Sequence, residues 1–115
     1  MKYDLEERTI KFSESVIELC QKINKNTITI LIIDQLIRSS TSIGANYREA
    51  NGASSRRDFK NKIFLCKKEA KETEYWLRLI SKAILEENQI IKCRFLWREN
   101  HELLLIFSKI AFNSK

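Results

Sequence analysis

The 115-residue chain contains no proline and only two glycines. Tight turns depend on these residue types, so their scarcity argues against an all-β fold. No apolar run approaches the roughly 18 residues of a membrane-spanning helix, and the first seven residues lack the apolar core of a signal peptide. The sequence therefore predicts a cytoplasmic protein with no membrane partner.

Residues that carry common chemistry are also scarce. The chain has a single histidine, which argues against a hydrolase triad and against a histidine-rich metal site. The sequence also contains no glycine-rich phosphate loop, no paired-cysteine zinc pattern and no HExxH motif. Cys20, Cys66 and Cys93 are far apart in apolar-periodic segments, so we expect buried, reduced thiols. The sequence predicts no metal, no cofactor and no enzymatic activity.

The chain does show strong helical periodicity. Apolar residues recur at three- and four-residue spacing in four segments separated by three short breaks. The β-branched run 28–33 resembles a strand, but the helical period continues through Tyr47. Short connections favour antiparallel neighbours, so we expect an all-α, up-down-up-down four-helix bundle in one domain spanning residues 1–115. The expected helices cover about residues 3–23, 28–51, 56–85 and 89–112.

The breaks carry helix-capping residues. The segment 24–27 offers caps for the second helix, and Ser54 or Ser55 can cap the third. Gly52 can take the left-handed conformation that ends many helices.

A polar stripe runs along the second helix in the rhythm of a packed seam. Polar groups buried without partners cost about 1–3 kcal/mol each, so a buried stripe requires partners on neighbouring helices. A solvated helix face is the alternative, and we favour a polar layer inside the bundle or between subunits. The stripe comprises Gln35, Ser39, Ser42, Asn46 and Glu49.

Glu69 lies at the margin of the apolar face of the third helix, close to Trp76 in projection. An unpaired carboxylate is costly there. Arg38 is the expected partner, in a pair or a network; extension of Glu69 into solvent is the alternative.

Positive charge is concentrated on the third helix. The net charge is +6, and residues 53–86 hold nine basic against five acidic side chains. Six cations fall within an arc of about 80°, namely Arg56, Lys60, Lys67, Lys71, Arg78 and Lys82. Such a row can follow a phosphate backbone, while Phe64 and Tyr75 beside it can stack on unpaired bases. A solubilising face is the alternative. The expected nucleic-acid contacts are Arg56, Arg57, Lys60, Lys67, Lys71 and Arg78.

One enzymatic alternative depends on the fourth helix. Arg94 and His101 are seven residues apart and so share a helix face. Their spacing resembles that of HEPN-type ribonucleases, which cleave RNA without a metal. The surrounding residues do not otherwise resemble that family.

The second helix carries a Gln-Leu-x-Arg-Ser segment and a Ser-Ile-x-x-Asn-x-x-Glu segment, followed by a serine- and arginine-rich turn and Asp-Phe. With these motifs, residues 5–110 resemble the bacterial four-helix bundle family often labelled 23S rRNA-intervening-sequence protein, whose first segment reads Gln-Leu-Arg-Arg-Ala/Ser. The matching residues are Gln35, Arg38, Ser39, Ser42, Ile43, Asn46, Glu49, Gly52, Asp58 and Phe59, and segments 67–70 and 72–77 match the family's glutamate-rich core helix. The family frequently has proline where this chain has Gly44, and either residue can bend a helix.

The resemblance implies a homopentamer of up-down bundles without enzymatic activity. Related accessory variability proteins of diversity-generating retroelements bind nucleic acid and a reverse transcriptase through a basic pentamer surface. The expected function is therefore a non-enzymatic homopentamer that binds RNA or another nucleic acid, or scaffolds a ribonucleoprotein. The alternatives are a structural oligomer with a protein partner and a HEPN-like ribonuclease.

Overall fold

Four helices make up most of the computed structural model, which describes residues 2–114, with side chains from residue 5 onward. They are α1 (Lys2–Lys22), α2 (Thr27–Asn51), α3 (Arg56–Ala83) and α4 (Glu87–Asn113), and no strand occurs in the described range. The bounds differ from the expected ones by at most two residues. The all-α expectation is confirmed.

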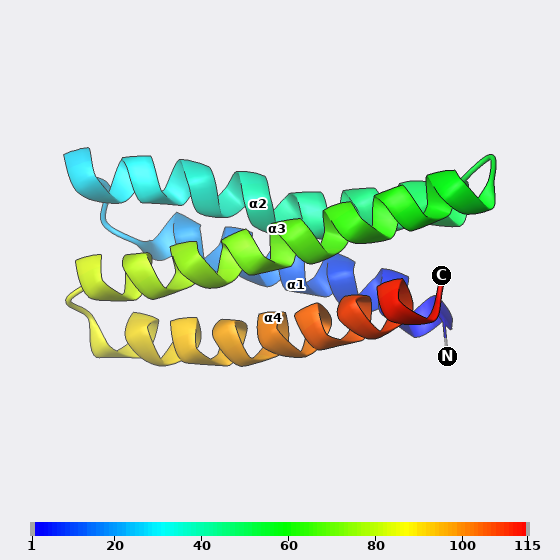
Figure 1. Ribbon diagram of the computed structural model, residues 1–115. Helices are drawn as coiled ribbons and strands as arrows, with labels where there is room; N and C mark the ends of the chain where they lie inside the picture. Colours follow the sequence, from blue (N-terminus) through cyan, green and yellow to red (C-terminus); the bar gives the residue numbers. More distant parts are fainter. Residues whose placement is uncertain (1, 115) are drawn as a thin grey trace.

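The helices lie side by side around one core, as Figure 1 shows. α1 contacts α2 and α4, and α3 contacts the same two helices, so α1 and α3 lie across the bundle from each other. The α1–α2 and α3–α4 connections lie at one end (Figure 1). The α2–α3 connection lies at the other end, together with the first turn of α1 and the last turn of α4 (Figure 1).

Side-chain caps begin the two middle helices. The Asn26 side chain accepts hydrogen bonds from the backbone N–H groups of Ile28 and Thr29, both at 2.9 Å, and the Thr29 hydroxyl accepts one from the Asn26 N–H at 2.9 Å. This capping box starts α2 and explains why the β-branched run is helical. Ser55 caps α3 by accepting a hydrogen bond from the Asp58 N–H at 3.0 Å.

Gly52 does not take the left-handed conformation that its position after α2 would allow. Its φ is −104°, and its N–H donates to the Glu49 carbonyl at 3.1 Å. The Ala53 N–H donates to the Ala50 carbonyl at 3.1 Å in the same pattern. The last turn of α2 therefore tightens to three-residue hydrogen bonds, which satisfy its carbonyls without a positive φ.

All four helices contribute to the apolar core. The largest fully buried apolar side chains are Val16, Leu36, Ile43, Ile63, Leu77, Ile80, Leu103 and Phe107. The three cysteines are buried and unpaired, as expected. Burial raises the pKa of Cys20 and Cys93 to about 11 and that of Cys66 to about 12. None of the four helices, within residues 2–114, is long and apolar enough to cross a membrane.

Gly44 marks a close approach between α1 and α2. A Cβ atom built on Gly44 would lie 3.0 Å from Thr9 Oγ1 and 3.1 Å from Thr9 Cβ. Thr9 is buried, and its hydroxyl donates to the Glu6 carbonyl at 2.8 Å. Glycine therefore lets the two backbones approach at this point.

Candidate nucleic-acid interface

The expected nucleic-acid contacts lie along one helix, α3. Lys60 and Lys67 are half-buried, and the other four are exposed: Arg56, Arg57, Lys71 and Arg78. None of the six makes an ion pair with a side chain in the range 5–114. Their charges are therefore available to an external partner.

The acidic side chains of α3 are all engaged. Glu69 and Glu72 bind Arg38 of α2, and Glu74 Oε2 lies 2.9 Å from His101 Nδ1 of α4. Asp58 accepts a hydrogen bond from the Ser54 N–H at 3.3 Å, within the α2–α3 turn. The acidic side chains of α3 are thus bound to groups outside this helix. Its cations, apart from Lys62, which pairs with Glu49, have no ionic partner among residues 5–114. The positive field of this face is therefore not neutralised within the subunit.

Two exposed aromatic rings lie within the cationic surface. Phe64 and Tyr75 line a shallow groove of about 610 Å³ with Lys67, Lys68, Lys71 and Glu72. The rings provide flat apolar surface and the lysines provide charge. This combination suits unpaired nucleotides, whose bases stack while their phosphates pair with cations.

A second groove, between α3 and α4, extends the cationic surface. It encloses about 510 Å³, and its polar and aromatic lining includes Arg78, Lys82, Arg94 and Trp97. Arg78 belongs both to this groove and to the expected contacts. The groove could not be predicted from the sequence, because it depends on the pairing of two helices, which the spacing within one helix does not reveal.

His101 is held between two partners. Its Nδ1 lies 2.9 Å from Glu74 Oε2, and its ring stacks on Trp97 with 5.1 Å between centroids and 6° between planes. Arg94 lines the α3–α4 groove beside Trp97. The ribonuclease assignment of Arg94 and His101 stays a prediction. No group of three or more His, Cys, Asp or Glu side chains in the described part of the chain could hold a metal ion.

The polar stripe of α2 is not a continuous buried layer within one subunit. Ser39 is fully buried and accepts a hydrogen bond from the Thr73 hydroxyl at 2.9 Å. Ser42 and Asn46 are half-buried and bond to carbonyls of their own helix, and Gln35 and Glu49 are exposed. Apart from Ser39, the stripe residues face away from the core, because they lie beside the apolar face of α2 and not on it. Involvement of the exposed members in a subunit contact stays a prediction.

Arg38 forms the expected network at the edge of α2 and α3. Its Nη1 lies 3.3 Å from Glu69 Oε1, its Nη2 binds Glu72, and its Nε donates to Gln35 at 3.5 Å. Trp76 Nε1 also donates to Glu72 Oε2 at 3.1 Å. The hydrogen bonds from Trp76 and Arg38 lower the pKa of Glu72, so this carboxylate is ionised at neutral pH.

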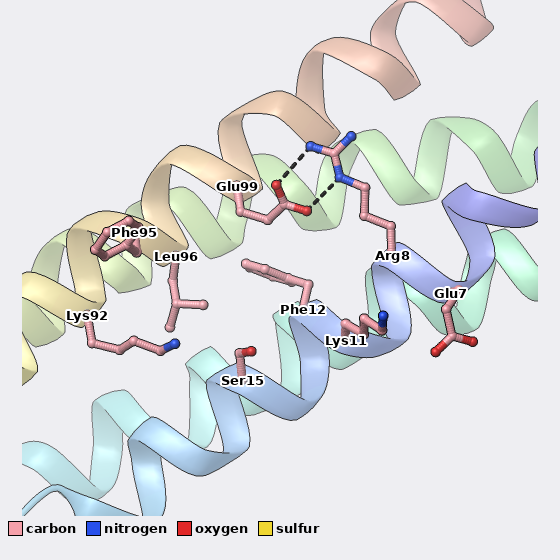
Figure 2. A pocket seen from close by; sticks show the side chains of 9 residues that line it. All are labelled: Glu7, Arg8, Lys11, Phe12, Ser15, Lys92, Phe95, Leu96 and Glu99. Atoms are coloured by element: carbon pink, nitrogen blue, oxygen red, sulfur yellow. Dashed lines mark hydrogen bonds and ion pairs between the residues drawn. The ribbon is translucent and has the colours of Figure 1, made fainter. Parts of the chain in front are cut away.

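A groove of about 520 Å³ between α1 and α4 was not expected from the sequence. Arg8 donates from Nε and Nη2 to the two carboxylate oxygens of Glu99, at 2.6 and 2.8 Å (Figure 2). Lys11 of α1 and Lys92 and Phe95 of α4 also line it (Figure 2). The Arg8–Glu99 bond fixes how the first and last helices sit against each other.

Comparisons with known proteins agree with this architecture. A solved structure from Bacteroides thetaiotaomicron, a protein of unknown function from the S23 ribosomal protein family, is similar with a TM-score of 0.78 and 30% sequence identity. The similarity covers 93% of this chain and 97% of that one. No curated protein gives a significant match. The sequence model of the 23S rRNA-intervening sequence proteins matches residues 1–104. The chain belongs to the 23S rRNA-intervening sequence protein family.

Proposed function

We propose that the chain is the subunit of a homopentamer of up-down four-helix bundles that binds RNA, without catalysis, along α3. The observation that carries the proposal is the separation of charge on that helix. Glu69, Glu72 and Glu74 are engaged by other helices, while Lys67, Lys71 and the rest of the expected contacts are not. A helix surface that keeps its cations unpaired suits a polyanion.

Unpaired nucleotides fit this surface better than a rigid duplex. Phe64 and Tyr75 are exposed within reach of the same lysines that would bind phosphates. Base stacking on aromatic rings requires bases that are free of a duplex. A structured RNA with loops is therefore the favoured ligand.

Assembly multiplies the effect of each weak site. Five copies of a subunit with a net charge of +6 would present five cationic surfaces on one particle. Binding at one surface raises the effective concentration of the RNA at the others. Measured affinity should then exceed that of a single α3 face.

The test is the salt dependence of RNA binding by fluorescence anisotropy. The double variant Lys67→Ala/Lys71→Ala removes two phosphate contacts and is expected to reduce the slope of log K against log salt by about 1.5 for each engaged subunit. The matched control, Lys11→Ala/Lys22→Ala, removes two exposed lysines from α1 and should leave the slope unchanged.

Other outcomes separate the alternatives. A pentamer whose RNA binding is absent or independent of salt would overturn the RNA proposal and favour a protein partner. Cleavage of the RNA that disappears in His101→Ala would overturn the non-enzymatic proposal. A monomer in light scattering would overturn the assembly.

A further inference from the structure

Two helices carry a second, solvent-exposed seam in addition to the one that faces the core. The exposed seam of α4 is a row of residues spaced alternately four and three positions apart. Its apolar members are Ile91, Phe95 and Leu105, whose side chains are 44%, 63% and 56% exposed. On α1 the spacings are three and four, and Ile10 and Ile17 are 39% and 38% exposed. Apolar residues at this rhythm on the outside of a helix are typical of helix-to-helix contacts. The α4 seam is Ile91, Phe95, Arg98, Glu102, Leu105 and Lys109, and the α1 seam is Glu7, Ile10, Glu14, Ile17 and Gln21.

The two seams carry opposite charge. The α1 seam presents Glu7 and Glu14, with Glu18 and Lys11 beside them, and none of the three acids has an ion-pair partner among residues 5–114. The α4 seam presents Arg98 and Lys109, which are also unpaired within that range. Its only acid, Glu102, is bound by Arg8 of the same subunit at 2.6 Å. Each seam therefore complements the other and repels a copy of itself.

We infer that the exposed face of α1 in one copy packs on the exposed face of α4 in the next copy, head to tail. This inference rests on the proposed assembly and specifies its contact. Because the two surfaces differ, the contact is heterologous, and it forms a ring when the rotation from one copy to the next closes. A symmetric dimer that paired either seam with its own copy would instead bring like charges together.

The contacts within one subunit set the register between copies. Arg8 bonds to Glu99 and Glu102, and Gln89 Nε2 donates to the Lys22 carbonyl at 3.0 Å, so α1 and α4 run in opposite directions at matched heights. If the ring axis is parallel to the bundle, rotation from one copy to the next does not change the position of a residue along that axis. Glu14 of one copy then lies level with the Phe95–Arg98 turn of the next.

The same register places apolar side chains opposite one another. Ile17 of one copy lies level with Ile91 and Phe95 of the next. The inferred contact uses the exposed faces of α1 and α4 and not that of α3, so the cationic face of α3 stays open to RNA. The proposed ring and the proposed binding surface are thus compatible.

The experiment is a charge-reversal rescue measured by light scattering and sedimentation. The wild-type ring should have a mass of about 68 kDa, five times the 13.6 kDa subunit. Glu14→Arg and Arg98→Glu should each raise the concentration needed for half-assembly at least about tenfold, and the combined variant should restore it. Both positions are exposed, so each variant should fold, and circular dichroism checks that it does.

The control reverses charge on the opposite helix. Lys67→Glu/Lys71→Glu should weaken RNA binding and leave the mass unchanged. If this control dissociates the ring while Glu14→Arg and Arg98→Glu do not, α3 forms the contact and the inference is wrong. A wild-type pentamer that resists both single reversals refutes the seam pairing alone, whereas a wild-type monomer refutes the proposed assembly with it.

Discussion

The close approach of α1 and α2 at Gly44 yields a prediction with two opposing terms. Replacing an interior helical glycine by alanine normally stabilises a helix by about 1 kcal/mol. Here the new Cβ would lie 3.0 Å from Thr9 Oγ1 and 3.1 Å from Thr9 Cβ. Both distances are shorter than an ordinary contact between such atoms, so one helix must shift. Overpacking of this kind costs about 1–3 kcal/mol.

Thr9 cannot relieve the contact by rotating its side chain. Its Cβ is attached to the backbone and does not move when χ1 changes, and its hydroxyl is buried and bonded to the Glu6 carbonyl. The steric cost should therefore exceed the gain in helix propensity. Gly44→Ala is expected to lower the free energy of unfolding by about 1 kcal/mol.

Urea denaturation followed by circular dichroism measures this change, with two further variants for comparison. Ala45→Gly, at the exposed neighbouring position, isolates the propensity term in the same turn and should cost about 1 kcal/mol. Thr9→Ala removes the nearer of the two atoms, so the penalty of Gly44→Ala should shrink in that background. If Gly44→Ala stabilises the protein by as much as Ala45→Gly destabilises it, the helices are not in close contact and the reasoning fails.

Two further predictions concern ionisable groups. Because burial raises the pKa of the three thiols from an ordinary value of 9.0 to about 11 or 12, their contribution to stability is complete below about pH 9 and is lost as the pH rises towards 11. Melting temperatures should fall over this interval, and thiol reagents should label Cys20, Cys66 and Cys93 only after unfolding; rapid labelling of the native protein would contradict their burial. Arg38→Ala should cost only about 0.5 kcal/mol, because Arg38 is nearly half exposed and its ion pairs are screened by solvent. Because the hydrogen bonds from Trp76 and Arg38 lower the pKa of Glu72 in the folded protein, the stabilisation by ionised Glu72 is present above about pH 4.5 and is lost at lower pH. Arg38→Ala removes part of this stabilisation, so it should also make stability fall less steeply as the pH is lowered. Arg48→Ala, at an exposed position of the same helix, is the matched control and should change neither quantity.

Much of the fold could be predicted from local sequence signals. The apolar period placed all four helices, and Asn26 and Ser55 carried recognisable capping chemistry. The same period accounts for the burial of Leu77 and Ile80, because burial follows the angular position of a residue around its helix. The backbone conformation of Gly52 could not be predicted, because several geometries satisfy the same terminal carbonyls and the sequence alone does not select among them.

The candidate site was only partly predictable. Lys67 and Lys71 share a face of one helix, so spacing revealed their proximity. By contrast, Arg8 and Glu99 are separated by 91 positions, and their contact depends on how the first and last helices meet. The α3–α4 groove with Arg94 and Trp97 has the same origin. Arg38 and Glu69 were expected to meet only because a carboxylate near an apolar face demands a partner, which is a chemical argument and not a positional one.

The position of the chain ends gives the proposed ring a direction. The first turn of α1 and the last turn of α4 lie at the same end of the bundle as the α2–α3 turn (Figure 1). In a ring whose axis follows the bundle, one rim therefore carries ten helix ends that lead to the termini, and the opposite rim carries only closed connections. A tag or fused domain at either terminus would crowd one rim and leave the other accessible, so immobilisation through the termini would present every particle in the same orientation.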